Sequence, residues 1–207
     1  MTGLRERKRH ELRSTIERAA VALVLEHGYD HVTVDMICAA AEASQRTFFN
    51  YFGSKEAAVL GPTPPAPDPA WLEEFVDRPR GDALSDLVRL MTRTIVAAQP
   101  DPKLLASRRE IIGATLVLMQ AQAARFAAKD EELTELVLRR FMTQGRPEPE
   151  PDLAAEARMI VSLWAGFIRF TVRPWSTSGH ADLTQELEAG ASVLERTIAN
   201  LAIVRQG

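Results

Sequence analysis

The stretch SQRTFFNYFGSKE, residues 44–56, is the feature that most constrains how this chain folds. It predicts two short helices joined at a hinge, Gly53, where the absence of a side chain permits a sharp change of direction. Ser44 and Ser54 stand where the two helices are expected to begin. At such positions a hydroxyl oxygen accepts an otherwise unsatisfied backbone N–H, so we expect two capped helices in close succession.

The first of these helices is expected to have two different faces. Phe48 and Phe52 lie four residues apart, so both rings can pack into one core. The side chains of the opposite face are polar and are expected in solvent: Gln45, Arg46, Thr47 and Asn50. Guanidinium, amide and hydroxyl groups of this kind read base edges in the major groove of DNA.

The segment before this helix completes the motif. Thr33 is placed to cap a helix over residues 33–41, and Asp35 lies in its first turn, where the helix dipole favours a carboxylate. Apolar residues recur on one face of this helix, at Val34, Ile37, Cys38 and Ala41. Two short helices separated by a turn of about three residues form a helix-turn-helix, whose second helix enters the DNA groove.

The order and spacing of these residues resemble the DNA-binding domain of TetR-family transcriptional regulators. The resemblance covers about residues 8–60, and its residues are Gly28, Tyr29, Val32, Thr33, Val34, Ile37, Ser44, Thr47, Phe48, Phe49, Tyr51, Phe52, Ser54, Lys55 and Glu56. With the polar face described above, it implies DNA contacts by Thr33, Ser44, Gln45, Arg46, Thr47, Phe49, Asn50 and Lys55. In this interpretation Arg46 and Gln45 read bases, whereas Thr33, Thr47 and Lys55 hold phosphates.

Two residues depart from the pattern of that family. Glu42 stands in the turn, where the family commonly has Gly, and a left-handed Glu carries strain of about 1 kcal/mol. Phe49 replaces a Tyr whose hydroxyl usually touches a phosphate, a contact that a phenyl ring cannot make.

Composition narrows the class of protein. The chain has 46% hydrophobic and 26% charged residues, as ordinary globular proteins do. Its net charge of −3 is unexpected for a DNA-binding protein. The N-terminal end with the motif is slightly basic and the remainder acidic, although random surface charge explains this as well. Because Cys38 is the only cysteine and no apolar run is long enough for a signal sequence or a membrane span, we expect a cytoplasmic protein with no membrane association.

The rest of the chain predicts further helices and one boundary. Five prolines within residues 61–70 cannot continue a helix and favour a semi-rigid spacer. We therefore expect an all-α protein with a three-helix helix-turn-helix domain (residues 1–60), a Pro-rich linker (61–70) and a helical effector-binding and dimerisation domain (71–207). The other expected helices span residues 10–27, 82–98, 102–112, 114–143, 152–172 and 182–204, with a loose basic arm at 1–9 and breaks at Gly113 and Pro174.

The last expected helix carries an apolar seam in steps of four and three residues: Leu187, Ala191, Leu194, Ile198 and Leu201. Such a period is typical of helices packed lengthwise. With residues 152–172 the seam can form a four-helix interface between two copies, as the TetR resemblance implies, or it can pack within one subunit. A two-fold dimer would present two reading helices to a palindromic operator.

The body also offers apolar side chains with a few polar anchors, the composition of a ligand pocket. The candidates are Met91, Ile95, Met119, Phe126, Trp164 and Phe167, with Arg108, Arg109 and Gln122 as polar anchors. Methionine and aromatic residues at helical spacing describe a packed core equally well. The resemblance implies an effector pocket but does not choose these residues.

The leading hypothesis is a homodimeric repressor of transcription that binds double-stranded DNA and releases its operator when a small, largely apolar effector binds. An all-α enzyme is a second hypothesis, but the chain has no zinc-protease, nucleophile-elbow, Walker or Rossmann motif, and we expect no cofactor or metal. A third is a helical adaptor that has lost DNA binding, which only Glu42 and Phe49 favour.

Overall fold

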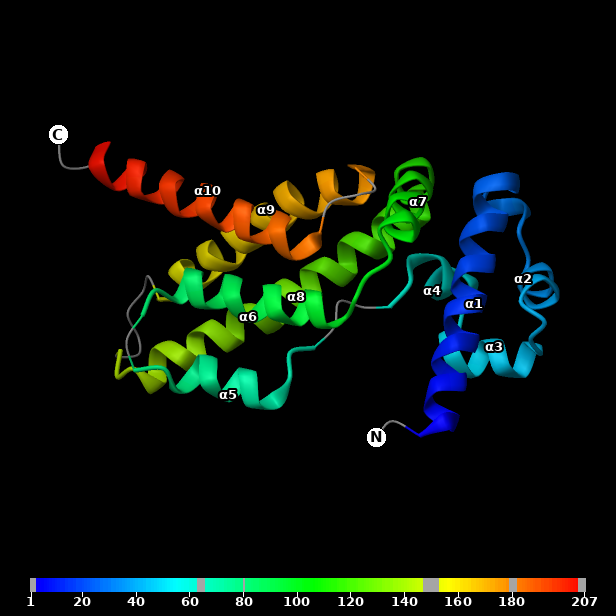
Figure 1. The fold of residues 1–207 in the computed structure, drawn as a ribbon, viewed down its shortest axis with the longest axis horizontal. Helices are drawn as coiled ribbons and strands as arrows, with labels where there is room; N and C mark the ends of the chain where they lie inside the picture. Colours follow the sequence, from blue (N-terminus) through cyan, green and yellow to red (C-terminus); the bar gives the residue numbers. More distant parts are fainter. Residues whose placement is uncertain (1–2, 63–65, 80, 147–152, 179–181, 205–207) are drawn as a thin grey trace. The chain divides into compact units, whose positions relative to one another are not determined.

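The computed structural model describes residues 3–62, 66–79, 81–146, 153–178 and 182–204. Within these ranges the chain forms helices and no strand, as the sequence predicts. The elements, in chain order, are α1 (Leu4–His27), the 3₁₀ helix η1 (Tyr29–His31), α2 (Val34–Ala40), α3 (Gln45–Phe52), α4 (Lys55–Leu60), α5 (Pro69–Asp77), α6 (Ala83–Ala97), α7 (Pro102–Ala114), α8 (Leu116–Thr143), α9 (Leu153–Ser178) and α10 (Leu183–Val204) (Figure 1).

The chain divides into two compact units. The first comprises Met1–Thr63 and Lys103–Arg125, and so contains α1 to α4, α7 and the first part of α8. The second comprises Pro64–Pro102 and Phe126–Gly207, with α5, α6, the rest of α8, α9 and α10. One division between the units falls inside the expected linker, whereas Lys103–Arg125 groups with the N-terminal helices and not with the body.

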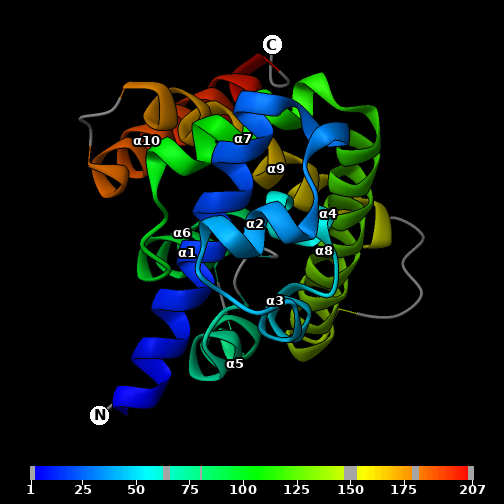
Figure 2. The same cartoon turned by 90° about the vertical axis from the view of Figure 1, so that its right-hand side faces the viewer.

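The core of the first unit surrounds α1, and Figures 1 and 2 both show α2 and α4 beside this helix. Ile16 and Ala20 of α1, with Ile37 of α2, are completely buried. Ile111 of α7 and Leu118 of α8 belong to the same core. The core of the expected helix-turn-helix domain is therefore completed by side chains from a distant part of the sequence.

Helix α1 starts at Leu4, so the prediction of a loose arm over residues 1–9 is wrong for the part of it that the structure describes. The reason is local: arginine, lysine, glutamate and leucine are strong helix formers. Arg7 and Glu11 add an ion pair across one turn, at 3.9 Å between Nε and Oε1.

In the second unit α9 and α10 pack closely, as Figure 1 shows. A Cβ atom added at Gly190 of α10 would lie 2.1 Å from Cγ2 of Thr171 on α9, so only glycine permits this approach. Pro174 lies inside α9, and the prediction that it ends the helix is wrong. Trp175 and Ser176 beyond it are buried, which offsets the loss of one helical hydrogen bond.

The break between α7 and α8 lies at Thr115, and the expected break at Gly113 is wrong because Gly113 lies within α7. The two helices are bent by 115° relative to each other. In the described part of the chain no single helix is long and apolar enough to cross a membrane, and α7 and α8 meet that criterion only when taken together.

Candidate nucleic-acid interface

The first helix of the motif, α2, begins as the sequence predicts. The hydroxyl oxygen of Thr33 accepts a hydrogen bond from the backbone N–H of Met36 at 3.2 Å. Ile37 and Cys38 are buried on the inner face. Burial raises the pKa of the Cys38 thiol, and the nearby carboxylate of Asp35 raises it further. Cys38 is therefore a protonated core residue.

The turn between α2 and α3 is held by backbone hydrogen bonds. Glu42 has a φ of +50°, the left-handed conformation that strains a residue other than glycine. The N–H of Ala43 donates to the carbonyl of Cys38 at 2.9 Å, and the N–H of Glu42 donates to that of Ala39 at 3.4 Å. This is the pattern of a Schellman helix end, which favours glycine at the position of Glu42. The strain of about 1 kcal/mol is therefore present in the folded turn.

Helix α3 is fixed at both ends. Ser44 Oγ accepts from the backbone N–H of Thr47 at 3.1 Å, and the two hydroxyls are 2.8 Å apart. Gly53 ends the helix in the left-handed conformation, with a φ of +71°. Ser54 then caps α4 by accepting from the N–H of Ala57 at 3.0 Å. Each of the three predicted caps is confirmed, and α3 is a rigid support for its side chains.

The two predicted faces of α3 are present. Phe48 is completely buried, and its ring centroid lies 5.6 Å from that of the half-buried Phe52. On the outer face Gln45, Arg46 and Asn50 are exposed and Thr47 is half-buried. Phe49, the residue that replaces the family's Tyr, is 50% exposed, which is unusual for a large apolar ring.

The outward side chains of α3 are not equally available. The Gln45 amide Nε2 donates one of its two N–H groups to Oδ1 of Asp35, in the first turn of α2, so one N–H and the carbonyl oxygen are left for a further partner. Arg46 is exposed and forms no ion pair with any residue that the structure describes. Arg46 is therefore the best placed of the candidates for base readout.

Lys55 is held inside the first unit. Its Nζ donates to the carbonyls of Tyr29 at 2.7 Å and Val32 at 2.9 Å, and lies 4.0 Å from the centroid of the Tyr29 ring. Two of its three N–H donors are thus used by the protein, and this accounts for a cation in the first turn of a helix. The sequence pattern did not indicate this structural role; contact with a phosphate stays a prediction.

Burial raises the pKa of the Tyr29 phenol, and the carboxylates of Glu56 and Asp30 raise it further. The ring is therefore neutral at physiological pH.

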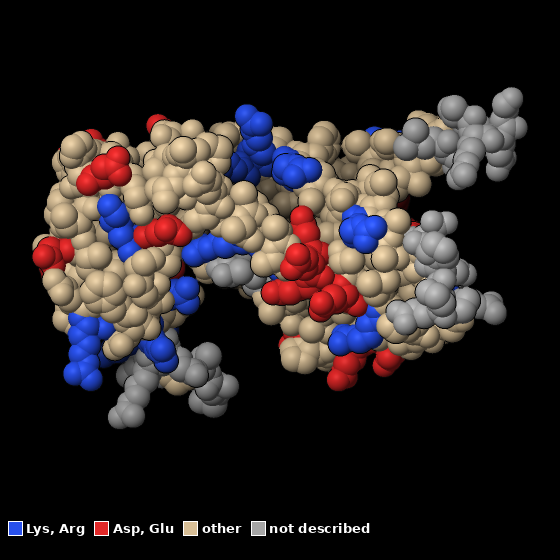
Figure 3. Space-filling view, turned by 180° about the vertical axis from the view of Figure 1, so that it is seen from behind, with Lys and Arg blue, Asp and Glu red and all other residues tan. Residues whose placement is uncertain are grey.

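Positive charge is sparse around the motif. Among residues 33–53 only Asp35, Glu42 and Arg46 are charged. Figure 3 shows a face on which acidic side chains gather in one larger patch and lysines and arginines form smaller, separate groups.

Arg108, expected as a polar anchor of a pocket, is instead part of the core of the first unit, and the expectation is wrong. Its Nη2 lies 2.7 Å from Oε2 of Glu17 on α1, and its Nε donates to the carbonyl of Val59 on α4 at 3.1 Å. Arg125 similarly donates to the carbonyl of Gly61 at 3.0 Å. No local pattern reveals these contacts, because each joins residues far apart in the sequence.

The other pocket candidates are distributed over both units. Met91, Trp164 and Phe167 are buried in the second unit, with 5.6 Å between the centroids of the last two rings. Arg109 and Met119 belong to the first unit. Of the remaining predicted lining residues, Ile95 is half-buried, Phe126 is 50% exposed and Gln122 is half-buried.

The structure has two hollows that the sequence did not predict. One is an open groove of about 730 Å³ in the first unit, lined by the end of α1, η1 and the junction of α7 and α8. The other is a hollow of about 60 Å³ between α5 and α6 in the second unit. No predicted pocket residue lines either of them, so the effector-binding role of those residues stays a prediction.

The apolar seam of α10 is partly used within the subunit. Leu187 is 1% exposed, so it packs on its own helices and is not available to a second copy. Ala191 and Leu194 are half-buried and Ile198 is 38% exposed. The side chain of Leu201 lies outside those that the structure describes. On α9 an exposed apolar face is formed by Met159, Leu163 and Phe170.

Residues 16–60 match the model of a protein family described as bacterial regulatory proteins, tetR family. All the residues proposed above to contact DNA lie within this match. The HTH-type transcriptional regulator TcmR of Streptomyces glaucescens is 29% identical over 196 residues, which are 93% of this chain and 85% of that protein. The similarity therefore extends far beyond the motif, and it is to a transcriptional regulator and not to an enzyme.

Two solved structures are also similar. A candidate TetR-family transcriptional regulator from Syntrophomonas wolfei is 18% identical, covers 90% of this chain and 94% of its own, and has a TM-score of 0.48. The fatty acid degradation regulator FadR from Bacillus halodurans is 22% identical, covers 88% and 93%, and has a TM-score of 0.46.

Proposed function

This chain belongs to the TetR family of bacterial regulatory proteins, and we propose that it is a dimeric repressor which releases its operator when a small, largely apolar effector binds. DNA binding and transcriptional regulation come with the family. The dimer, the effector and the sign of regulation are our proposal. The observation that best supports it is the outer face of α3, where Arg46 stands exposed on a helix whose ends are both fixed.

In this proposal Arg46 and Gln45 read bases, Gln45 with its carbonyl oxygen and its second N–H, and Asn50 lies on the same face. Thr33 and Thr47 hold phosphates with their hydroxyls, with Lys55 using its remaining N–H donor. Ser44 keeps α3 in place. The backbone amides at the N-terminus of α3 favour a phosphate. The exposed ring of Phe49 contacts the sugar-phosphate backbone by apolar contact only.

The test is fluorescence anisotropy with the promoter DNA nearest the chain's own gene and with random DNA. Arg46→Ala should lose about 1–3 kcal/mol of discrimination between the two, the usual value of one good base contact. Arg18→Ala is a matched control, because Arg18 is exposed on α1 and its only described partner is Ser14. Equal losses on both DNAs for Arg46→Ala would exclude base readout by this residue. No binding to either DNA by the unaltered chain would favour the adaptor.

We propose that two copies associate through α9 and α10, with Ala191, Leu194, Ile198 and Leu201 at the interface. The exposed apolar face of α9 supports this, since apolar side chains at this spacing are costly in water. Phe170→Glu should yield monomers in sedimentation experiments, whereas Met142→Glu, at another exposed apolar position, on α8, should not. A dimer that survives Phe170→Glu would place the interface elsewhere.

We propose that the effector binds in the helical domain of residues 71–207. It would act by binding more tightly to one of two arrangements of the two DNA-binding domains in the dimer. Met91, Ile95, Trp164 and Phe167 are the first candidates, followed by Arg109, Met119 and Phe126. Because Met91, Trp164 and Phe167 are buried, Phe167→Ala should lower the stability of the free protein even if the ligand lies elsewhere. A role of Phe167 in the pocket therefore requires that Phe167→Ala changes the free energy of effector binding by more than it changes the free energy of unfolding.

A further inference from the structure

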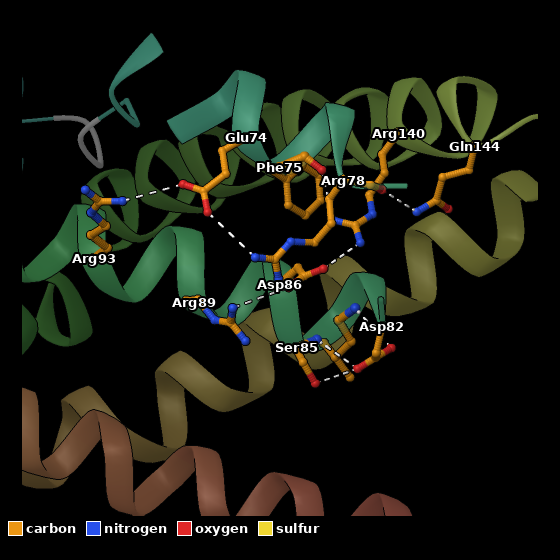
Figure 4. Close-up of polar contacts among 11 residues, drawn as sticks. Glu74, Phe75, Arg78, Asp82, Ser85, Asp86, Arg89, Arg93, Arg140 and Gln144 are labelled. Atoms are coloured by element: carbon orange, nitrogen blue, oxygen red, sulfur yellow. Dashed lines mark hydrogen bonds and ion pairs between the residues drawn. The ribbon is translucent and has the colours of Figure 1, made fainter. Parts of the chain in front are cut away.

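The second unit contains an arginine-rich hollow whose lining includes none of the residues proposed to contact DNA. It lies between α5 and α6, has a volume of about 60 Å³, and its lining includes Trp71, Glu74, Arg78, Asp86, Arg89 and Arg93. Figure 4 shows the last five of these residues. About 10–15 Å³ of such volume suffices for one water molecule, so the hollow has room for several waters. It can therefore admit a carboxylate or phosphate group.

Positive charge exceeds negative charge around the hollow. The guanidinium groups are those of Arg78, Arg89, Arg93 and Arg140, and the carboxylates are those of Glu74 and Asp86. Arg140 does not line the hollow, so the lining itself carries three arginines against two carboxylates, an excess of one positive charge. The nearby carboxylate of Asp82 is engaged at the start of α6, where it accepts from the N–H and the hydroxyl of Ser85 at 2.9 and 2.6 Å.

Two of the arginines have a structural role. Asp86 is buried, and its carboxylate lies 2.6 Å from Nη1 of Arg78 and 2.5 Å from Nη2 of Arg140. Arg140 is completely buried and also donates to the carbonyl of Phe75 at 2.9 Å. These bonds tie α5, α6 and α8 together and already neutralise Asp86.

The other two arginines, Arg89 and Arg93, are not needed for that packing. Their side chains are 66% and 54% exposed. Their nearest carboxylate oxygens, on Asp86 and Glu74, are 3.9 and 3.8 Å away, beyond normal hydrogen-bond length. The Arg93 guanidinium lies 3.8 Å from the centroid of the Trp71 ring, which holds it at the rim of the hollow.

Arg89 and Arg93 lie four residues apart on α6, so their side chains share one face. Exposed guanidinium groups with unused N–H donors recognise the paired oxygens of carboxylates and phosphates. We propose that the hollow binds the anionic group of a small molecule, a carboxylate or a phosphate, between Arg89 and Arg93, beside Trp71. The proposal does not rest on the DNA-binding function, since the binding is measured in the absence of DNA.

The test is titration of the full chain with benzoate and, separately, with inorganic phosphate, at constant ionic strength. Binding is followed by calorimetry and by tryptophan fluorescence, to which Trp71 contributes. The test variant is Arg89→Gln/Arg93→Gln. Its charge-matched control is Arg18→Gln/Arg139→Gln, which removes two arginines that do not line the hollow.

We expect saturable binding of at least one anion, weakened about tenfold or more by the test variant and unchanged in the control. Saturation by benzoate alone identifies a carboxylic acid as the ligand class, and saturation by phosphate alone a phosphorylated one. No saturation by either anion, or equal affinity in the test variant, overturns the proposal.

Misfolding is distinguished from loss of the site by thermal unfolding. Exposed ion pairs contribute little to stability, so the test variant should keep its helical circular dichroism and its unfolding midpoint. Trp71→Phe provides a second check, because it removes the reporting indole but keeps an aromatic ring beside Arg93. It should abolish the fluorescence change and preserve the calorimetric binding. A fluorescence change that survives in Trp71→Phe would overturn the assignment to this hollow.

Discussion

Replacing Arg108 by methionine tests whether a buried ion pair holds α7 in the first unit. The side chains of Arg108 and Glu17 are only 9% and 10% exposed, and Nη2 and Oε2 are 2.7 Å apart. Arg108 also packs against Gly61, where an added Cβ atom would lie 2.3 Å from its Cζ. Methionine retains much of the apolar stem and removes the charge and the hydrogen bonds.

The expected loss of stability follows from what stays behind. Removing one partner of a buried ion pair usually costs about 3–5 kcal/mol, because the other charge is left buried. Here Glu17 keeps a second partner, since Nε of Arg13 lies 3.2 Å from its Oε1. We therefore expect a loss at the lower end, about 3 kcal/mol. Removing one partner of an exposed ion pair would cost only about 0–1 kcal/mol of stability.

The assay has to report on the first unit alone. All three tryptophans, Trp71, Trp164 and Trp175, lie in the second unit, so tryptophan fluorescence does not serve. Hydrogen exchange of the α1 and α7 amides gives the free energy of opening for these helices directly. Arg18→Met, at an exposed position of α1, is the control and should change stability by less than about 0.5 kcal/mol.

Two results would refute this reasoning. One is a loss below about 1 kcal/mol for Arg108→Met, the value of an exposed pair. The other concerns the double variant Glu17→Gln/Arg108→Met. The two residues of an ion pair are coupled. The double variant should therefore lose less stability than the two single variants lose in sum, by about 0.5–3 kcal/mol. Strictly additive losses would mean that the two side chains do not stabilise each other.

Further outcomes follow from other positions. Glu42→Gly should raise stability by up to about 1 kcal/mol in thermal unfolding, since it relieves a left-handed backbone. Gly190→Ala should destabilise the second unit by about 1–3 kcal/mol, because the added methyl group overlaps α9. Gly113→Ala, which meets nothing within 4 Å in a helix, should stabilise by about 0.5–1 kcal/mol. A hydrogen bond from Arg146 lowers the pKa of Glu156, so a small stabilisation present at neutral pH should fade as the pH falls through that lowered pKa. The check is to measure the stability of the unaltered protein and of Arg146→Gln as the pH is lowered.

Those parts of the fold that depend on neighbouring residues were predictable from the sequence. The caps at Thr33, Ser44 and Ser54 each use a hydroxyl and an N–H three residues later, so the pattern contains both partners. Asp182 likewise caps α10 by accepting from the N–H of Thr184 at 2.9 Å. The left-handed position of Glu42 was indicated by the family resemblance, in which glycine is common there.

The parts that depend on distant partners were not predictable. Arg108 and Glu17 are 91 positions apart, and no periodicity marks them as partners. The same holds for Lys103–Arg125, whose apolar residues complete the core of the first unit. The periodicity of the α10 seam does not distinguish a partner in the same subunit from one in a second copy, and Leu187 is buried within its own subunit.

Several cations of this protein, Lys55 and some of the arginines, donate to backbone carbonyls. A helix leaves its last four carbonyls without an internal partner, and in this protein several such groups are met by cations. In the first unit Arg108 donates to the carbonyl of Val59 and Arg125 to that of Gly61, at the end of α4. In the second unit Arg140 donates to the carbonyl of Phe75, near the end of α5. These side chains are consumed by the fold.

A second group of cations has no such partner among the described residues. Arg46 on α3, and Arg89 and Arg93 on α6, are exposed and donate to no helix end. Exposed cations are common and need no ligand. These three differ from scattered surface charge because each stands beside a shaped surface, the outer face of α3 or the hollow next to Trp71. This is why we assign DNA readout to the first and anion binding to the other two, and why their substitutions should alter binding while leaving stability nearly unchanged.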